Sequence, residues 1–342
     1  MTADLAPAAH QPADGIPSAL RPRRTNLSES ARRRLQGSVP DETLRAYKRE
    51  WPRFVAWCQG EGEPSLPCST DALTNWVADR CDAGNGLSAI KQGIAAVVFF
   101  HDQANVHEKL MPDTGDAWRI VGAYKKERAD AGHREVRAEV FTPEELRLMV
   151  ATLPQERRVA RLRDGAMLTA GTSSFVRRSN LVRFDLPDLT FTDDGDARLF
   201  KTYSKTDQAA RGHPVTIPPG EHELSDPVGW LRAWREEMRK QGINDGPLFR
   251  RISRTGRILP YRLHASHLNN LVKQTAKAAK LEPRPNTTYR AHSTRASGAT
   301  AAAEAGAAFS QICEQGDWSE KGTQAQIYIR PTKKDNAMRG VL

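Results

Sequence analysis

Residues 290–330 read RAHSTRASGATAAAEAGAAFSQICEQGDWSEKGTQAQIYIR. His292 and Arg295 are three residues apart, and the alanine-rich run after them predicts a helix that carries both side chains on one face. Trp318 follows, and Tyr328 lies ten residues beyond it. A guanidinium, an imidazole and an indole can donate hydrogen bonds to a phosphate, and a phenol can attack one. The stretch therefore predicts a site for phosphate chemistry.

Each of these residues also has an ordinary structural interpretation when it is considered alone. A His-x-x-Arg pair is most often a solvated helix face, a tryptophan usually lies in a core, and a tyrosine near a C-terminus usually packs or lies at the surface. The combination is more specific than its members. It requires a second arginine and a proton donor from elsewhere in the chain.

Composition favours a polyanionic partner. The chain has 342 residues, enough for two domains, and a formal net charge of +10. Nucleic acid is the commonest partner of such a basic protein, and the alternative is a basic protein without one. The sequence has no run of about 18 apolar residues and no apolar leader, so we expect no membrane span and no secretory signal. We expect a cytoplasmic, nucleoid-associated protein.

The cysteines and the paired histidines predict no metal site. Cys58, Cys68, Cys81 and Cys313 lack Cys-x-x-Cys spacing, so we expect reduced core residues of an intracellular protein. The pair at positions 264 and 267 has no neighbouring cysteine or carboxylate to complete a ligand set, which favours a polar helix surface over a metal site.

The N-terminal half predicts a basic arm followed by a small helical domain. Residues 1–38 are rich in Ala, Pro, Ser and Arg, so we expect a disordered arm that lies along DNA or only solubilises the chain. Residues 39–128 show apolar residues at three- and four-residue steps. The predicted helices cover residues 41–58, 71–82, 89–101 and 118–128. Candidate DNA contacts on their outward faces are Arg45, Lys48, Lys91 and Gln92.

The C-terminal half predicts a mixed α+β domain. Residues 129–139 are charged and nearly free of large apolar residues, so they are interpreted as a linker. The second domain is predicted at residues 140–330, and residues 331–342 form a tail that we expect to pack on a neighbouring subunit. Its predicted helices cover residues 143–153, 157–171, 174–184, 227–241, 264–280 and 292–306. Its predicted strands cover residues 189–191, 199–203 and 214–217.

These features resemble the phage-integrase family of tyrosine recombinases, the Cre- and Xer-like site-specific recombinases. Residues 43–58 and 87–101 look like the family's SAM-like helical core-binding domain, and residues 140–330 look like its catalytic domain. The resemblance implies a mainly α fold with a small antiparallel β-sheet. It also implies a recombinase that needs neither cofactor nor metal, acts on double-stranded DNA with specific recombination sites, and forms a homotetramer in the synaptic complex.

The resemblance assigns the catalytic roles residue by residue. Arg177, in Arg-Arg-Ser-Asn-Leu, matches the family's first arginine, although Asn180 stands where the family usually has an acid. Lys205 matches the lysine of the family's β-hairpin, with Lys201 as the alternative on the same hairpin. The remaining matches are His292 and Arg295 for the His-x-x-Arg box, Trp318 for the following His-or-Trp position, and Tyr328 for the nucleophile.

The implied chemistry explains why these residue types are needed. Two guanidiniums bind the non-bridging oxygens of the scissile phosphate, the tyrosine forms a 3′-phosphotyrosine, and a lysine protonates the departing 5′ oxygen. A type IB topoisomerase-like enzyme, which nicks and reseals one strand, shares this chemistry and is the rival enzyme. A catalytically inactive DNA-binding protein and a metal-dependent transposase are two further candidates. The combination of His292, Arg295, Trp318 and Tyr328 argues against an inactive binder.

Overall fold

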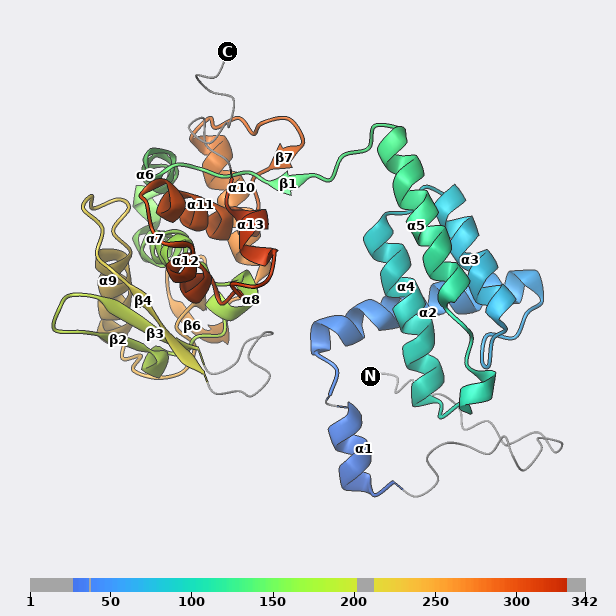
Figure 1. The fold of residues 1–342 in the computed structure, drawn as a ribbon. Helices are drawn as coiled ribbons and strands as arrows, with labels where there is room; N and C mark the ends of the chain where they lie inside the picture. Colours follow the sequence, from blue (N-terminus) through green and yellow to red (C-terminus); the bar gives the residue numbers. More distant parts are fainter. Residues whose placement is uncertain (1–26, 37, 202–211, 331–342) are drawn as a thin grey trace, which may run out of the picture. The chain divides into compact units, whose positions relative to one another are not determined.

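The computed structural model describes residues 27–36, 38–201 and 212–330. The chain divides into two compact units, Met1–Arg134 and Glu135–Leu342. Figure 1 shows that the first unit is helical and that the second combines helices with short strands. The predicted class, mainly α with small antiparallel sheets, is confirmed. No helix of the described residues is both long enough and apolar enough to cross a membrane.

The helices of the first unit follow the predicted periodicity. Phe54, Trp76 and Ile94 come from three different helices and are buried together in its core. Part of the predicted disordered arm is instead helical, because Ser28 caps its first turn by accepting a hydrogen bond from the amide of Ala31 at 3.2 Å. The helices are α1 Glu29–Gln36, α2 Asp41–Glu61, α3 Thr70–Asp82, α4 Leu87–Gln103, η2 Glu108–Leu110 and α5 Gly115–Asp130.

The second unit carries most of the chain's described elements. Its helices are α6 Pro143–Ala151, η3 Gln155–Arg157, α7 Arg158–Ser173, α8 Arg178–Leu181, η4 Leu186–Asp188, α9 Pro227–Lys240, α10 Ser266–Ala278, α11 Ala291–Glu304, α12 Phe309–Gly316 and α13 Gln324–Tyr328. Its strands are β1 Arg137–Ala138, β2 Leu189–Phe191, β3 Ala197–Lys201, β4 His213–Ile217, β5 Arg250–Ile252, β6 Ile258–Arg262 and β7 Thr287–Thr288.

Three small sheets are formed by these strands. The three predicted strands form one antiparallel sheet, β2-β3-β4, in which Lys201 at the end of β3 pairs with His213 at the start of β4. The sequence did not predict the antiparallel pair β5-β6 or the parallel pair β1-β7. Each pairing in these two sheets is short, so hydrophobic alternation over two to five residues is too weak a signal to find them.

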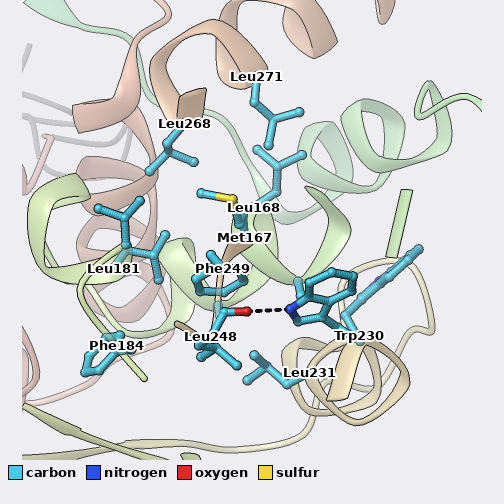
Figure 2. Close-up of a cluster of buried hydrophobic side chains, with 14 of the residues drawn as sticks. Met167, Leu168, Leu181, Phe184, Trp230, Leu231, Leu248, Phe249, Leu268 and Leu271 are labelled. Carbon is cyan, nitrogen blue, oxygen red and sulfur yellow. Dashed lines mark hydrogen bonds between the residues drawn. The ribbon is translucent and has the colours of Figure 1, made fainter. Parts of the chain in front are cut away.

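Helix α7 lies at the centre of the unit's hydrophobic core. It packs against α9 and against α11, and Met167 and Leu168 on α7 are fully buried. Figure 2 shows these two residues among leucines and aromatic rings from the surrounding elements. Trp234 on α9 adds a polar anchor, because its indole N–H donates to the carbonyl oxygen of Leu248 at 2.8 Å. The helices that pack on α7 therefore rest on a closely packed support.

A buried carboxylate fixes the entry into the second unit. Glu139 is 2% exposed and accepts hydrogen bonds from the backbone amide of Arg284 at 2.6 Å and from its Nε at 2.9 Å. Burial would raise the pKa of Glu139, but the hydrogen bonds from Arg284 and Thr287 lower it to about 2. Residues 137–139 therefore belong to the packed second unit, although the sequence predicted a linker over residues 129–139.

The predicted helix over residues 174–184 is wrong. Helix α7 ends at Ser173, and Phe175 has a positive φ of 52°, which a continuous α-helix does not tolerate. Within residues 174–184, only the four residues of α8 are helical. The break places the carbonyl of Phe175 where Arg295 on α11 donates to it, and Arg177 near enough to Arg295 for its charge to act on that residue.

Candidate active site

Helix α11 carries His292 and Arg295 and packs closely on its neighbours. Residues 293–300 are all buried. A Cβ atom on Gly298 would overlap the carbonyl oxygen of Thr172 and the ring of Phe175, so only glycine allows this approach. The small residues that looked like a plain helix in the sequence therefore bring α11 against the end of α7.

Arg295 is buried and held from several sides. The residue is only 2% exposed, its Nη1 donates to the carbonyl oxygen of Phe175, and its Nη2 donates to that of Gly316 at 2.5 Å. The Nε atom has no hydrogen-bond partner among the described residues. Burial, followed by the nearby positive charge of Arg177, lowers the pKa of Arg295 to about 10. The guanidinium is therefore fixed in place and has free N–H groups.

Trp318 lies directly over this guanidinium. Helix α12 ends at Gly316, and Trp318 then places the centre of its ring 4.0 Å from the Cζ atom of Arg295. The ring is 8% exposed, and its Nε1–H is buried without a partner among the described residues. A buried donor without a partner is costly, and a bound phosphate oxygen would satisfy it.

Tyr328 is the last residue of α13 and completes the cluster. Its ring centre lies 5.1 Å from that of Trp318 and 6.5 Å from that of His292, with the imidazole and phenol planes 11° apart. The Cζ atom of Arg295 lies 5.1 Å from the centre of the phenol ring. The main chain of Tyr328 is tied to α11 because the hydroxyl of Thr300 donates to its carbonyl oxygen at 3.3 Å.

Arg177 lies close enough to the cluster to act on its charges. It is half-buried at the N-terminal boundary of α8. Its positive charge contributes to lowering the pKa values of Arg295 and His292. For His292, which is partly open to solvent, desolvation of the ring is the largest cause, and repulsion from Arg290 and Arg178 comes next. Desolvation and the surrounding arginines thus act in the same direction on the pKa of His292.

The structure describes only one of the two candidate lysines. Lys205 lies outside the described residues. Lys201 is the last residue of β3, is 4% exposed, and donates from Nζ to Oδ2 of Asp317 at 2.9 Å. The sequence did not single out Asp317, because nothing in the spacing connects it with a strand 116 residues earlier. The only signal was a carboxylate directly before Trp318.

The candidate DNA-contacting residues lie on α2 and α4 of the first unit. Arg45, Lys48 and Lys91 are exposed, and Gln92 is half-buried. The two helices pack together, and Arg49 joins them by donating from Nη2 to the side-chain oxygen of Gln92 at 3.1 Å. The structure thus brings the predicted residues onto one helix pair.

The histidine before α10, His264, and the histidine in its first turn, His267, each make a polar contact. His267 lies 2.9 Å from Oδ1 of Asp164, and His264 lies 2.7 Å from the hydroxyl of Ser266. Among the described residues, no three His, Cys, Asp or Glu side chains are gathered into a possible metal site.

Comparison with known proteins agrees with this geometry. The sequence model of the phage integrase family matches residues 139–335. An integrase/recombinase xerD homolog from Selenomonas ruminantium is 30% identical over 281 residues, which cover 81% of this chain and 78% of that protein.

Two solved structures have the same fold. The integrase of the Tn1549 transposon in complex with transposon right-end DNA has a TM-score of 0.56 and 13% identity, with coverage of 90% of this chain and 95% of that one. A lambda integrase tetramer bound to a Holliday junction has a TM-score of 0.52 and 15% identity, with coverage of 90% and 78%. The family match covers more than half of the chain and includes the whole residue cluster described above, so this chain belongs to the phage integrase family of tyrosine recombinases.

Proposed function

We propose that this chain is a site-specific recombinase that cleaves and rejoins DNA through a covalent 3′-phosphotyrosine. One observation carries the proposal. The phenol of Tyr328, the indole of Trp318 and the guanidinium of Arg295 lie in mutual contact, with unpartnered N–H donors beside the phenol. A nucleophile next to fixed donors is the arrangement that phosphoryl transfer requires.

The proposed reaction has two symmetrical steps. The phenolic oxygen of Tyr328 releases its proton to solvent as it attacks the scissile phosphorus, a phosphorus–oxygen bond to tyrosine forms, and the bond to the 5′ oxygen breaks. That oxygen takes a proton, for which Lys205 is the proposed donor, and leaves as a 5′ hydroxyl. A 5′ hydroxyl from another strand then attacks the phosphotyrosine and releases Tyr328. The ester conserves the bond, so rejoining needs no ATP.

The surrounding residues stabilise the charge that develops on phosphorus. Arg295 and Arg177 are proposed to bind the two non-bridging oxygens, because a guanidinium offers two parallel donors in fixed geometry. The indole N–H of Trp318 and the imidazole of His292 are proposed to add single hydrogen bonds. The fixed positive charge of the arginines then stabilises the negative charge on the phosphate, and no step of the proposed reaction uses a metal ion.

DNA is the proposed partner, and assembly is proposed to follow DNA binding. The solved relatives hold transposon-end DNA or form a tetramer on a Holliday junction, which supports this assignment. We propose a monomer in free solution and a homotetramer on two paired recombination sites, with residues 331–342 contacting a neighbouring subunit. Those residues lie outside the described part of the chain. The proposed place of action is the nucleoid in the cytoplasm.

The experiment that tests this function traps the covalent complex. A duplex selected from a random-sequence pool by its affinity for the full-length protein serves as the target. A nick near the scissile phosphate lets the cleaved fragment diffuse away. The nicked target is incubated with protein in EDTA and denatured in detergent. Wild type should leave protein on a 3′ phosphate and release a 5′ hydroxyl end.

Tyr328→Phe should bind the target with unchanged affinity and leave no adduct, because the ring remains and the hydroxyl is lost. Tyr289→Phe and Tyr261→Phe are the matched controls, one at a buried and one at an exposed tyrosine, and both should still trap. An adduct in Tyr328→Phe, or attachment mapped to another tyrosine, would contradict the assignment of the nucleophile.

A further inference from the structure

A buried ion pair joins Lys201 to Asp317, the residue directly before Trp318. Lys201 is the one lysine that is buried within the described ranges of the chain. Its side chain is 5% exposed, and that of its partner Asp317 is 19% exposed. Removing an ammonium from water is costly unless a partner and good geometry compensate. This cost makes a well-formed contact between β3 and the end of α12 necessary for the folded state.

Asp317 occupies the turn that supports both Arg295 and Trp318. Its backbone is left-handed, with φ 55° and ψ 50°, a conformation that most residues avoid and aspartate tolerates. The residue before it, Gly316, accepts a hydrogen bond from Arg295, and a Cβ atom on Gly316 would overlap the ring of Trp318. A small rotation at Asp317 would therefore move the indole and break the contact that holds the guanidinium.

We propose that Lys201 is a positioning residue, whose ion pair with Asp317 holds the 316–318 turn so that Arg295 and Trp318 face the phosphate. This role rests on the proposed recombinase function. The pair has a second consequence, because the positive charge of Lys201 offsets a carboxylate that would otherwise repel the phosphate. The proton donor is then a different residue, and Lys205 remains the proposed one.

The geometry argues against Lys201 as the proton donor itself. Burial lowers the pKa of Lys201, with Asp317 opposing the shift, and that direction would suit a general acid. However, its Nζ is occupied by the carboxylate of Asp317, and almost all of the side chain is closed to solvent. Asp317 accepts from one of the three N–H donors of the ammonium, and the burial of the side chain leaves a departing 5′ oxygen little access to the other two. The contact therefore fits a fixed support better than a mobile donor.

Two substrates separate positioning from proton donation. Both are the nicked target duplex, with the scissile phosphate mapped from the wild-type adduct, and in one of them sulfur replaces the 5′-bridging oxygen. A thiolate leaves without protonation, so loss of a general acid is corrected by the sulfur and loss of positioning is not. Lys201→Met should form the adduct about 100-fold more slowly on both substrates, as expected for misplaced groups, with DNA affinity unchanged. Lys205→Met, the comparison variant, should recover on the sulfur substrate.

A second variant distinguishes a loss of positioning from a loss of folding stability. Lys201→Met combined with Asp317→Asn removes both charges, and such neutral replacement of a buried pair usually preserves folding. We expect a melting temperature close to that of wild type and adduct formation that stays slow on both substrates. Arg158→Met is the matched control, because Arg158 pairs with the buried Glu237 at 2.7 Å at the opposite end of α7 from Phe175, and its rate should equal that of wild type.

Each result decides between the possibilities. Recovery of Lys201→Met on the sulfur substrate would make Lys201 the proton donor and overturn the inference. A double variant that cleaves at the wild-type rate would show that the pair serves folding alone. If wild type forms no adduct on either substrate while still binding DNA, the proposed function itself fails, and the role of Lys201 fails with it.

Discussion

The guanidinium carbon of Arg295 lies 4.0 Å from the centre of the Trp318 ring, and the same guanidinium donates to the carbonyl oxygens of Phe175 and Gly316. An arginine side chain has five N–H donors, so those two contacts leave others free. The stacking fixes the plane of the group, and the two carbonyls fix its rotation within that plane. The free donors are thus aimed before any phosphate arrives.

Arg295→Lys should slow adduct formation by roughly 100- to 1,000-fold, the usual effect of losing one fixed transition-state donor. Lysine keeps the charge, but a single nitrogen cannot contact both carbonyls and also present two donors to the phosphate. Single-turnover trapping on the nicked target measures the rate. Arg239→Lys on the exposed face of α9 is the control and should react normally. Near-normal trapping by Arg295→Lys would mean that this residue only binds DNA.

Trp318→Phe should reduce the trapping rate by about tenfold, the value of one ordinary hydrogen bond. Phenylalanine retains an aromatic face for Arg295 but lacks the indole N–H, which has no protein partner in the described part of the chain. The melting temperature should change little, because the lost donor is unsatisfied in the free protein. An unchanged rate would show that Trp318 contributes stacking alone and donates nothing to the phosphate.

DNA affinity should fall steeply with salt, since each neutralised phosphate releases counterions. Lys48→Ala and Lys91→Ala should each flatten the slope of log affinity against log salt by about 1 if the side chain contacts a phosphate. Filter binding or fluorescence anisotropy with full-length protein gives the slope. Arg119→Ala alters an exposed arginine of the same unit that is already paired with Asp116, and it should leave the slope unchanged. Equal slopes in all variants would remove this helix pair from the interface.

Glu139→Gln should destabilise the protein at neutral pH and much less in acid. The folded pKa of Glu139 is about 2, below its usual 4.5, so ionised Glu139 stabilises the folded state above pH 4.5. That contribution, about 3 kcal/mol, is lost as the pH falls from 4.5 towards 2. Denaturant unfolding of wild type and variant at pH 7 and pH 3 measures the difference. A difference that stays constant with pH would contradict the ionised contact with Arg284.

The sequence predicted the elements with strong periodicity and the residues with distinctive spacing. Helices α2 and α9 lie where the apolar pattern placed them, because each is long and has one buried face, and α11 lies where the alanine-rich run placed it. His292 and Tyr328 were proposed from their residue types and spacing and from the family resemblance, and the structure brings their rings together. Such predictions succeed where the signal lies within one stretch of chain.

The failures involve contacts between distant segments. The break at Phe175 depends on packing against α11, and local propensity across residues 174–184 favours a continuous helix. The Lys201–Asp317 pair joins a strand to a helix end, and Glu139 joins β1 to the segment before β7. Charged residues are usually predicted to be exposed to solvent, so the burial of these residues is recognised only when the fold shows their partners.

Gly298 sets a limit on how this protein can be redesigned. Because α11 meets the carbonyl of Thr172 and the ring of Phe175 with no side chain between them, any larger residue there must push away the helix that carries His292 and Arg295. Mutant libraries meant to change the DNA target should therefore keep this position and its neighbours on α11 constant. Diversity belongs on the exposed residues of α2 and α4 that are proposed to contact DNA, because α2 and α4 belong to a different compact unit from α11.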